Sequence, residues 1–424
     1  MNTNALAHDP SLLGQPRFPS PLQGRRDHFI GEGARVLMAS TLADLGSGPP
    51  QSLEQAGPRR EIYFDPAEIA CGIVTCGGLC PGLNDVIRAV TLTLTYSYGV
   101  KRIYGFRYGY AGVAQSKGVE PVLLTPEVVE RIHEQGGTFL SSSRGPQEIG
   151  DMLEKLERLN VRILFAVGGD GTLQGASLIA AEALKRGLDI GVVGIPKTID
   201  NDLLWIERSF GFATAVEEAT RALAAAHAEA TGAYNGVGLV KLMGRHSGFI
   251  TAQATLANSD VNFCLVPEVE FGLEGFLEAL TLRLAQRHHA VIAIAEGAGQ
   301  EWMQTEGRDA SGNKRLGDCG IFLKKAIEAH LAARGLDHTV KYIDPSYIIR
   351  SLPANALDSE YCLALGQHAV HAGMSGRTDL MVGYWNQHFT HVPLQLITGK
   401  RRYLDPQGEL WQRVLAATGQ PSRM

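Results

Sequence analysis

The chain has 424 residues, 45% of them hydrophobic, which is enough apolar material for two or three domains with large buried cores. No window approaches 18 uncharged apolar residues, so the composition excludes a membrane-spanning helix. The formal charge of −5 argues against a general nucleic-acid coat, and we expect neither a nucleic-acid nor a membrane partner.

The first 57 residues are rich in Pro, Gly, Ser and Gln, with one brief apolar patch at 35–45. They show no signal peptide, and we expect a partly ordered extension that wraps the body or mediates assembly. Six cysteines are too few for a disulfide framework, which indicates a cytoplasmic protein. Cys71, Cys76 and Cys80 are expected to be packing residues, since their spacings do not fit zinc sites.

From residue 58 onward, apolar runs typical of strands alternate with amphipathic windows typical of helices. This pattern predicts parallel sheets that are covered on both faces. Ligands bind such sheets at the carboxyl ends of the strands, where the glycine clusters of this chain fall. The predicted strands span 69–74, 162–167, 190–195, 237–242 and 290–295, and the predicted helices span 85–95, 152–159, 173–185, 213–229 and 273–285.

The loop after the first predicted strand reads TCGGLCPGLND and contains Gly77, Gly78 and Gly82. These glycines let backbone N–H groups face an anion at the N-terminus of the next helix, where the helix dipole favours negative charge. The loop matches neither the dinucleotide fingerprint nor the P-loop. A tight turn without a ligand is the alternative.

The loop after the second predicted strand reads GGDGT and places Asp170 between glycines. Asp170 either caps the next helix or binds, directly or through water, the Mg²⁺ of a polyphosphate, and we favour the magnesium role. The same string occurs in NAD kinases and lipid kinases. It therefore indicates a nucleotide kinase without identifying its substrate.

The third loop, PKTIDND at 196–202, gathers Lys197, Asp200 and Asp202 after a buried strand. A pair of carboxylates suits general-base chemistry, in which one accepts a hydroxyl proton while the other orients neighbouring groups. A solvated turn is the alternative interpretation.

Two later segments suit a sugar phosphate. KLMGRHSG places Arg245 at a glycine-flanked turn, and KYIDPSYIIRS offers a tyrosine and two cations for phosphate oxygens. Glu296 ends a predicted strand and can accept hydrogen bonds from sugar hydroxyls. Each residue alone is equally compatible with a surface ion pair.

Together these motifs resemble the 6-phosphofructokinase family over residues 58–421, with wording closest to the long clade of plant-type and trypanosomal ATP-dependent enzymes. The resemblance implies an α/β fold of two similar parallel-sheet, Rossmann-like domains that face each other across a cleft. The coarse boundaries are 1–57 (extension), 58–205 (nucleotide-binding), 206–391 (sugar-phosphate-binding) and 392–424 (a segment packed on the body through Trp411). The strings that carry the resemblance are GGLCPGLN, GTFLSSSRG, GGDGT, PKTIDND, GFATAVEEA, KLMGRHSGF, YIDPSYIIRS, AVHAGMSG and TGQP.

The resemblance also implies residue roles. Asp200 is the expected proton acceptor for the 1-hydroxyl of fructose 6-phosphate, and Asp170 is the expected Mg²⁺ ligand. Thr198, Ile199 and Asp202 are expected to support the reacting end of the sugar. The nucleotide phosphates are expected to contact Gly77, Arg144, Gly145, Gly169, Asp170, Gly171 and Thr172, and the sugar and its 6-phosphate Met243, Gly244, Arg245, Glu296, Lys341, Tyr347, Ile348, Ile349 and Arg350.

Two positions bear on the phosphoryl donor. Pyrophosphate-using relatives carry Asp where this chain has Gly171 and Lys at the position of Lys197, whereas the short ATP-using enzymes carry Gly at both. We favour ATP, because a carboxylate at 171 would occupy and repel the space of the α-phosphate. A pyrophosphate-dependent enzyme is the alternative, and a catalytically inactive regulatory subunit is the non-enzyme alternative.

Three further expectations concern partners and histidines. The family implies a homodimer or homotetramer, with ATP and fructose 6-phosphate as small-molecule partners. Short family members borrow an arginine from a neighbouring subunit at the position of Gly236, and carry histidine at Tyr347. His368 and His371 are expected to be buried or interface residues rather than metal ligands.

Overall fold

The computed structural model describes residues 6–45, 48–303, 307 and 315–424. The chain forms two compact units. Unit 1 comprises Met1–Thr198, Leu203–Gly211 and Leu352–Arg401, and unit 2 comprises Ile199–Asp202, Phe212–Ser351 and Arg402–Met424. Across the described ranges, no helix is long and apolar enough to cross a membrane.

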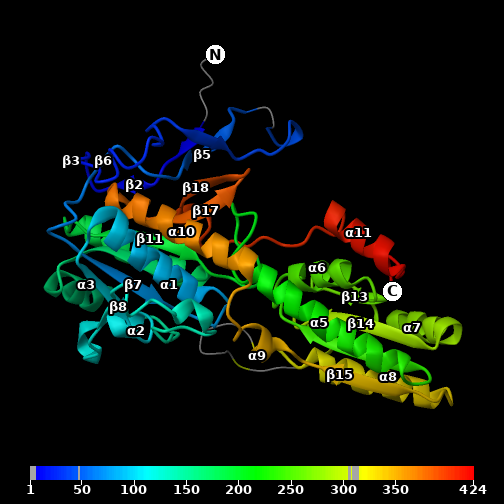
Figure 1. Cartoon of the computed structure of the whole chain (residues 1–424). Coiled ribbons are helices and arrows are strands. Elements are labelled where there is room, and N and C mark those ends of the chain that lie inside the picture. Colours follow the sequence, from blue (N-terminus) through cyan, green and yellow to red (C-terminus); the bar gives the residue numbers. More distant parts are fainter. Residues whose placement is uncertain (1–5, 46–47, 304–306, 308–314) are drawn as a thin grey trace. The chain divides into compact units, whose positions relative to one another are not determined.

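Unit 1 combines a large sheet with helices on both of its faces (Figure 1). Its helices are α1 (Leu83–Leu92), α2 (Tyr110–Val113), α3 (Ile149–Arg158), α4 (Asp170–Lys185) and α10 (Ala356–Met374). Its described strands are β1 (Leu6–His8), β2 (Ser11–Leu12), β3 (Phe18–Pro19), β4 (Arg35–Leu37), β5 (Gln51–Gln55), β6 (Glu61–Ile62), β7 (Ala70–Thr75), β8 (Arg102–Phe106), β9 (Val122–Leu123), β10 (Val161–Gly168), β11 (Gly191–Pro196), β16 (Arg377–Thr378), β17 (Leu380–Trp385) and β18 (His388–Pro393).

The sheet of unit 1 runs in the order β1-β5-β18-β17-β11-β10-β7-β8-β9, with β4 paired to β5. Its centre, from β17 to β8, is parallel as predicted, whereas β9 and β18 add antiparallel strands on either side. In β10, Leu164 and Ala166 pack toward α3 and α4, while Ile163 and Phe165 approach Gly373 of α10. Burial on both faces explains the continuous apolar run of this strand.

The N-terminal extension is more ordered than its composition predicts. Its strand β5 pairs antiparallel with both β4 and β18, and Leu53 of β5 is fully buried. Within residues 6–57, β1, β4 and β5 extend the sheet of unit 1, whereas β2 pairs with β16 and β3 pairs with β6. Residues 1–5 and 46–47 lie outside the described part of the chain.

A group of buried ionic side chains, here called the Glu54 cluster, fixes this extension. It consists of Glu54, Arg59, Arg377 and His391, all less than a tenth exposed. The carboxylate of Glu54 accepts hydrogen bonds from Arg377 Nε at 2.8 Å and Nη2 at 2.5 Å, pairs with Arg59 at 3.2 Å and contacts His391 Nδ1 at 2.6 Å. The composition of residues 1–57 gave no sign of it, because Arg377 and His391 come from the far end of the chain.

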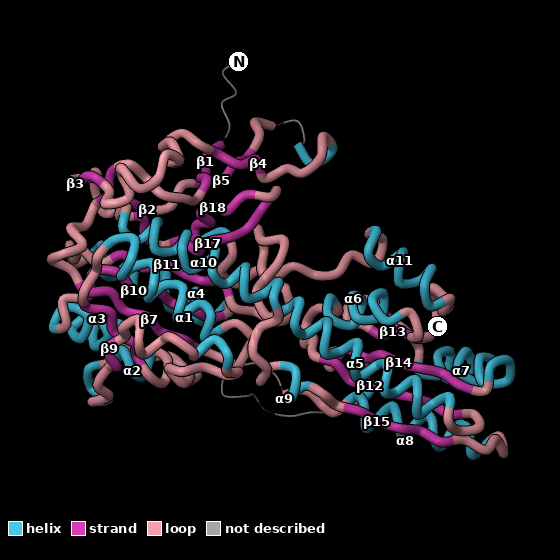
Figure 2. Tube along the Cα trace, viewed as in Figure 1, coloured by secondary structure: helices cyan, strands magenta, loops and turns pink. Residues whose placement is uncertain are grey.

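Unit 2 is a four-stranded parallel sheet in the order β13-β14-β12-β15 (Figure 2). α5 contacts β12, β14 and β15, and α6 contacts β13 and β14. α7 and α8 pack with the apolar residues of β12 and β14 in one core cluster. The strands are β12 (Gly236–Leu242), β13 (Phe263–Leu265), β14 (His289–Ala295) and β15 (Thr339–Ile343), and the helices are α5 (Phe212–Thr231), α6 (Phe249–Asn258), α7 (Leu273–Arg287), α8 (Cys319–Ala333), α9 (Ser346–Ile349) and α11 (Glu409–Thr418).

The C-terminal segment predicted at 392–424 is divided between the units, with the change after Arg401. From Arg402 onward it packs on unit 2, where α11 contacts α6. Trp411 is 2% exposed and shares a core cluster with Leu404 and Ala252. The burial of Trp411 fits the predicted anchoring for residues 402–424, but not for residues 392–401, which belong to unit 1.

The contact-based division differs from the predicted boundaries at 205/206 and 391/392. Residues 352–391, which the sequence placed with the second domain, belong to unit 1. The reason is that α10 packs against α1, and β17 pairs with β11. The sequence shows where each element lies, but not which sheet a late strand joins.

Every predicted strand and helix exists, with small shifts at the ends. The predicted helix at 85–95 is the exception in type, because its last residues continue as a π-helix over Thr93–Tyr98. The sequence analysis gave no ranges for the other elements, among them β8, β13, β15, β17, β18, α6, α8 and α11.

All six cysteines are free and buried. Burial raises the pKa of the Cys76 thiol to about 12, so that it is neutral and unreactive at ordinary pH. The interpretation of Cys71, Cys76 and Cys80 as packing residues fits this burial.

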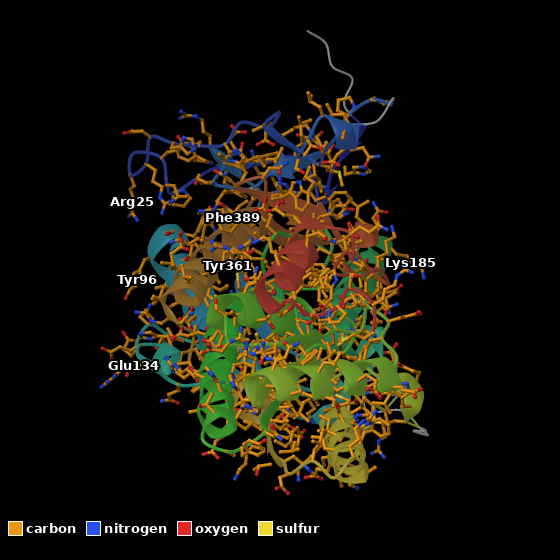
Figure 3. All side chains as sticks on the ribbon, turned by 90° about the vertical axis from the view of Figure 1, so that its right-hand side faces the viewer. Arg25, Tyr96, Glu134, Lys185, Tyr361 and Phe389 are labelled. Atoms are coloured by element: carbon orange, nitrogen blue, oxygen red, sulfur yellow. The ribbon has the colours of Figure 1, made fainter. Side chains whose placement is uncertain are left out.

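Of the two helical histidines, His371 is buried, as expected, and His368 is partly buried. His371 Nδ1 lies 2.7 Å from the hydroxyl of Tyr98, and the His368 ring stacks on Phe389 with centroids 4.2 Å apart. Burial lowers the pKa of His368 to about 4. Figure 3 labels Tyr361 and Phe389 of the same aromatic group, whose rings stack at 6.0 Å.

Candidate functional site

In unit 1, the loop between β7 and α1 is joined to the end of β11. Lys197 follows β11, is 7% exposed and donates a hydrogen bond from Nζ to the carbonyl of Gly78 at 2.8 Å. The N–H of Lys197 donates to the carbonyl of Gly168 at 3.0 Å. The parallel strands β7, β10 and β11 are neighbours in the sheet, so their carboxyl ends and the loops that follow them lie at one edge.

A fourth segment, around residues 141–145, lies against the same loop. The N–H of Gly77 donates to the carbonyl of Ser143 at 3.1 Å, and Ser142 Oγ donates to the carbonyl of Gly77 at 2.7 Å. Arg144 follows directly and is exposed, with no hydrogen bond or ion pair to the described residues. Arg144 and Gly145 were expected near Gly77, and the structure brings them together.

The GGDGT motif forms the start of α4. Gly169 is the N-cap residue and Asp170 is the first helical residue, so the unpaired N–H groups of the first turn belong to this motif. Thr172 is 7% exposed, and its carbonyl accepts a hydrogen bond from Tyr110 at 2.7 Å. A Cβ atom added to Gly171 would meet nothing within 4 Å, so this position is open.

Among the described contacts, only one oxygen of the Asp170 carboxylate accepts a hydrogen bond. Oδ1 accepts a hydrogen bond from the N–H of Gly399 at 3.1 Å, and the side chain is partly exposed. The described part of the chain contains no group of three or more His, Cys, Asp or Glu side chains that could hold a metal. Asp170 can therefore serve as a single carboxylate ligand to an ion that keeps most of its water or phosphate ligands.

Residues 199–202 belong to unit 2, and they form a turn rather than regular structure. Asn201 has a φ of 56° in the left-handed region, and Asn201 and Asp202 are each 5% exposed. The carbonyl of Asp200 accepts a hydrogen bond from Ser247 Oγ at 3.3 Å. Ile199 is 7% exposed, so its side chain packs in the protein.

Ser247 lies on the loop between β12 and α6, which also carries Met243, Gly244 and Arg245. The backbone of this loop contacts the loop after β14, because the N–H of Gly297 donates to the carbonyl of Gly244 at 3.1 Å. The N–H of Glu296 donates to the carbonyl of Leu242 at 2.9 Å. The structure thus brings Arg245 and Glu296 to neighbouring strand ends, as expected.

Glu296 sits among cations. Burial raises the pKa of its carboxyl above the ordinary range, although Arg245, Lys241 and Arg350 act in the opposite direction. The cations that oppose this rise in pKa include Arg350, from the segment after β15. A carboxylate with cations around it can accept hydrogen bonds from hydroxyl groups and fix a neighbouring anion.

The sequence analysis missed Lys241, the last polar side chain of β12. It pairs with Asp318 at 3.0 Å and Asp344 at 2.9 Å. Burial opposes its charge, but the hydrogen bonds with the two carboxylates raise the pKa of Lys241 well above the ordinary range. The sequence feature that could have identified Lys241 is a lysine within an otherwise apolar predicted strand.

The YIDPSYIIRS segment brings together only part of the expected set. The Arg350 guanidinium lies over the Tyr347 ring, 4.4 Å from its centroid, and both Tyr347 and Ile348 are exposed. Ile349, expected to bind substrate, is fully buried, so its side chain is a core residue. Lys341 pairs with Glu229 of α5 at 3.6 Å, and no described contact joins it to Arg350.

Gly236 cannot be replaced by a larger residue. A Cβ atom at this position would lie 2.1 Å from the carbonyl oxygen of Ala230. Its N–H donates to the carbonyl of His288 at 3.2 Å at the start of β12. The departure from the arginine of the short enzymes is thus fixed by the packing of α5 on β12.

The family described as "Phosphofructokinase" matches residues 70–373. The ATP-dependent 6-phosphofructokinase of Amycolatopsis methanolica is 49% identical over 97% of this chain and 94% of its own length. The enzyme of the same name from Trypanosoma brucei brucei is 49% identical over 87% of this chain and 77% of its own length.

Solved structures agree on the fold. The pyrophosphate-dependent phosphofructokinase of Marinobacter aquaeolei covers 83% of this chain and 92% of its own, with a TM-score of 0.70 and 20% identity. The T-state phosphofructokinase of Pichia pastoris covers 87% of this chain and 41% of its own, with a TM-score of 0.65 and 21% identity. At such identities the likeness concerns the fold alone.

Proposed function

The chain belongs to the phosphofructokinase family, and from this premise we propose that it transfers the γ-phosphoryl group of ATP to the 1-hydroxyl of fructose 6-phosphate. Curated relatives at about half identity, over most of their length, are named for ATP, which supports the ATP interpretation of the sequence over the pyrophosphate alternative. The product is fructose 1,6-bisphosphate.

Unit 1 offers the chemistry that a polyphosphate needs. The N-terminal turn of α4, the backbone around Gly77 and the cations Lys197 and Arg144 suit the negative charge of phosphate oxygens. The observation that carries the ATP proposal is the open position at Gly171, where any larger side chain would extend into free space. We assign Gly145, Gly169 and Thr172 to the same phosphate contacts.

Unit 2 offers the chemistry that the acceptor needs. Asp200 accepts the proton of the 1-hydroxyl as that oxygen attacks phosphorus, while Thr198 and Asp202 flank it in the chain. Arg245 and Glu296 contact the sugar, and Tyr347 and Arg350 contact its 6-phosphate. The chain reaches Asp200 three residues after Lys197, so one short peptide serves both the donor and the acceptor.

Phosphofructokinases are kinases, which generally need a divalent metal, and we propose Mg²⁺ with Asp170 as its protein ligand. Its single, partly exposed carboxylate fits an ion that keeps several waters and is otherwise bound by substrate phosphates. When bound, such an ion neutralises charge on the transferring phosphoryl group.

The assembly and compartment are also proposals. A homodimer or homotetramer follows from family membership, and a cytoplasmic location is supported by six free, buried cysteines.

The test measures fructose 6-phosphate phosphorylation with ATP and with pyrophosphate, each with Mg²⁺, for the native chain and for Gly171→Asp. We expect the native chain to use ATP. Gly171→Asp should lower kcat/KM for ATP at least about tenfold, because a second carboxylate beside Asp170 repels phosphate oxygens. The substitution should not affect folding, since the position is open and the φ angle of Gly171 is ordinary.

Gln174→Asp, which adds the same charge at an exposed position of α4, is the matched control and should change kcat/KM less than twofold. Activity of the native chain with pyrophosphate alone would reverse the donor assignment. Inactivity with both donors would favour the regulatory-subunit alternative.

A further inference from the structure

The conformation of the turn that carries Asp200 depends on contacts from outside the turn. It follows β11 without joining a helix or strand, and Asn201 adopts a left-handed φ of 56°. This region is uncommon for residues other than glycine, although asparagine tolerates it, so contacts with neighbours help to determine the conformation. The contacts of the turn with the rest of unit 2 therefore decide where the carboxylate of Asp200 lies.

Two of these contacts come from one distant residue, Arg402. Its backbone N–H donates to the carbonyl of Asp202 at 2.8 Å, and its Nη2 donates to the carbonyl of Asn201 at 2.8 Å. Its guanidinium lies over the Phe249 ring, 4.7 Å from the centroid. Stacking and a charge-assisted hydrogen bond together fix the guanidinium, and with it the carbonyl of Asn201. The carbonyl of Asp202 is held by the backbone of residue 402, whichever side chain that residue carries.

Residues 402–404, here called the strap, also reach the loop that carries Arg245. The N–H of Leu404 donates to Glu268 Oε1 at 2.9 Å, and the N–H of Gly248 donates to both carboxylate oxygens of Glu268 at 3.0 Å. Gly248 is the N-cap residue of α6. A single, partly buried carboxylate thus ties the strap to the end of the loop 243–248.

The strap itself is held firmly in place. Leu404 is 1% exposed and packs in the core cluster of Trp411 and Ala252, the latter on α6. The hydrogen bond from Ser247 Oγ to the carbonyl of Asp200 joins the loop to the turn. Together these contacts form a closed ring within unit 2.

We propose that Arg402 is a positioning residue that sets the place of the Asp200 carboxylate through the carbonyls of Asn201 and Asp202. The proposal rests on the proposed role of Asp200 as the proton acceptor. A general base acts only within hydrogen-bond reach of its proton, and a displacement of about 1 Å can cost as much as 10²-fold in rate. Because this role is exerted through the turn, substitution of Arg402 should change kcat more than the KM for fructose 6-phosphate.

The first experiment measures kcat and the KM for fructose 6-phosphate of Arg402→Met and Arg402→Lys with ATP. Arg402→Met keeps the aliphatic stem over Phe249 and should lower kcat about 10- to 100-fold, with KM changed less than threefold. Arg402→Lys keeps a donor for the carbonyl of Asn201 and should recover part of this loss. Arg413→Ala, an exposed arginine of α11, is the control and should change kcat less than twofold.

The second experiment repeats Arg402→Met in an Asp200→Ser background. If Arg402 acts through Asp200, the substitution should lower the residual kcat less than threefold there, because the positioned group is already absent. An equal loss in both backgrounds would overturn the proposal and leave the function of Asp200 intact. Equal kcat values for the Met and Lys variants would contradict it as well.

A near-normal kcat for Asp200→Ser alone would instead remove Asp200 from the mechanism, and the positioning role with it. Should Arg402→Met not fold, the Lys variant in the two backgrounds gives the same comparison.

Discussion

The N-terminal extension of unit 1 and the strap of unit 2 are both segments far along the chain from the elements they contact, yet they are held by different chemistry. The extension adds β4 and β5 to a sheet and is fixed by the Glu54 cluster. The strap adds no strand. It donates hydrogen bonds to backbone carbonyls of the turn 199–202 and to the carboxylate of Glu268, which also accepts from the N–H of Gly248.

This difference in contacts suggests that the two segments affect different properties, folding stability in one case and catalysis in the other. Removing one partner from a buried ionic group leaves the others without compensation, and this lowers the free energy of unfolding. Loosening a backbone contact beside a general base moves a reacting group without exposing a charge or a core. We therefore expect the extension to govern unfolding and the strap to govern turnover.

The largest expected effect concerns the turn held by the strap. Asp200→Ser should lower kcat by about 10²- to 10⁴-fold, since a positioned base contributes that much, while the KM for fructose 6-phosphate changes little. Steady-state kinetics with ATP measures both constants, and thermal unfolding should show a small shift. A large fall in the unfolding temperature, beside the loss of kcat, would contradict the assignment of this turn to chemistry alone.

The second effect concerns the extension. Glu54→Gln should lower the free energy of unfolding by about 3 kcal/mol, because Arg377 and Arg59 lose their buried counter-charge and keep only the exposed Glu32 as a partner. The kcat of the folded variant should stay within twofold of the native value. Denaturant unfolding and steady-state kinetics measure the two quantities, with the exposed Glu61→Gln as the matched control.

The pH dependence of the Glu54 variant sharpens this test. Burial opposes ionisation, yet hydrogen bonds from Arg377 and His391 hold the pKa of Glu54 below its ordinary range. A depressed carboxyl pKa stabilises the fold above the unfolded value of about 4.3 and loses that contribution as the pH falls. The stability difference between the native chain and Glu54→Gln should therefore shrink below about pH 4, and a constant difference would show that charge is not its cause.

The smallest effect concerns Glu296, whose pKa is raised by burial. A raised carboxyl pKa means that stability is lost as the pH rises through that value, so Glu296→Gln should unfold at a slightly higher temperature than the native chain at pH 7. It should also lower kcat/KM for fructose 6-phosphate about tenfold or less, because an amide accepts weaker hydrogen bonds than a carboxylate.

Thermal unfolding at pH 7 and pH 4 and steady-state kinetics provide these values, with exposed Glu301→Gln as the control. The stability gain should vanish at pH 4. A variant that is less stable at pH 7 would place Glu296 with the Glu54 cluster, as a residue that supports the fold.

Local patterns in the sequence determined much of this protein. Apolar runs and helical windows located the central strands and helices, because burial of both sheet faces leaves a signature in consecutive residues. The loops around Gly77, Asp170 and Asp200 were predicted from composition at strand ends, since parallel strands place those ends at one edge. Family resemblance added the role of each residue, which spacing alone does not give.

Only the tertiary structure decided what distant residues do to these loops. The pairing of β17 with β11, the burial of Ile349 and the closed space at Gly236 depend on elements far apart in the chain. Arg402 lies 200 positions after Asp202 in an unremarkable stretch of sequence, and its hydrogen bonds go to backbone carbonyls. A carbonyl is present at every residue, so no sequence pattern marks it as a partner, and the fold alone selects which one is bound.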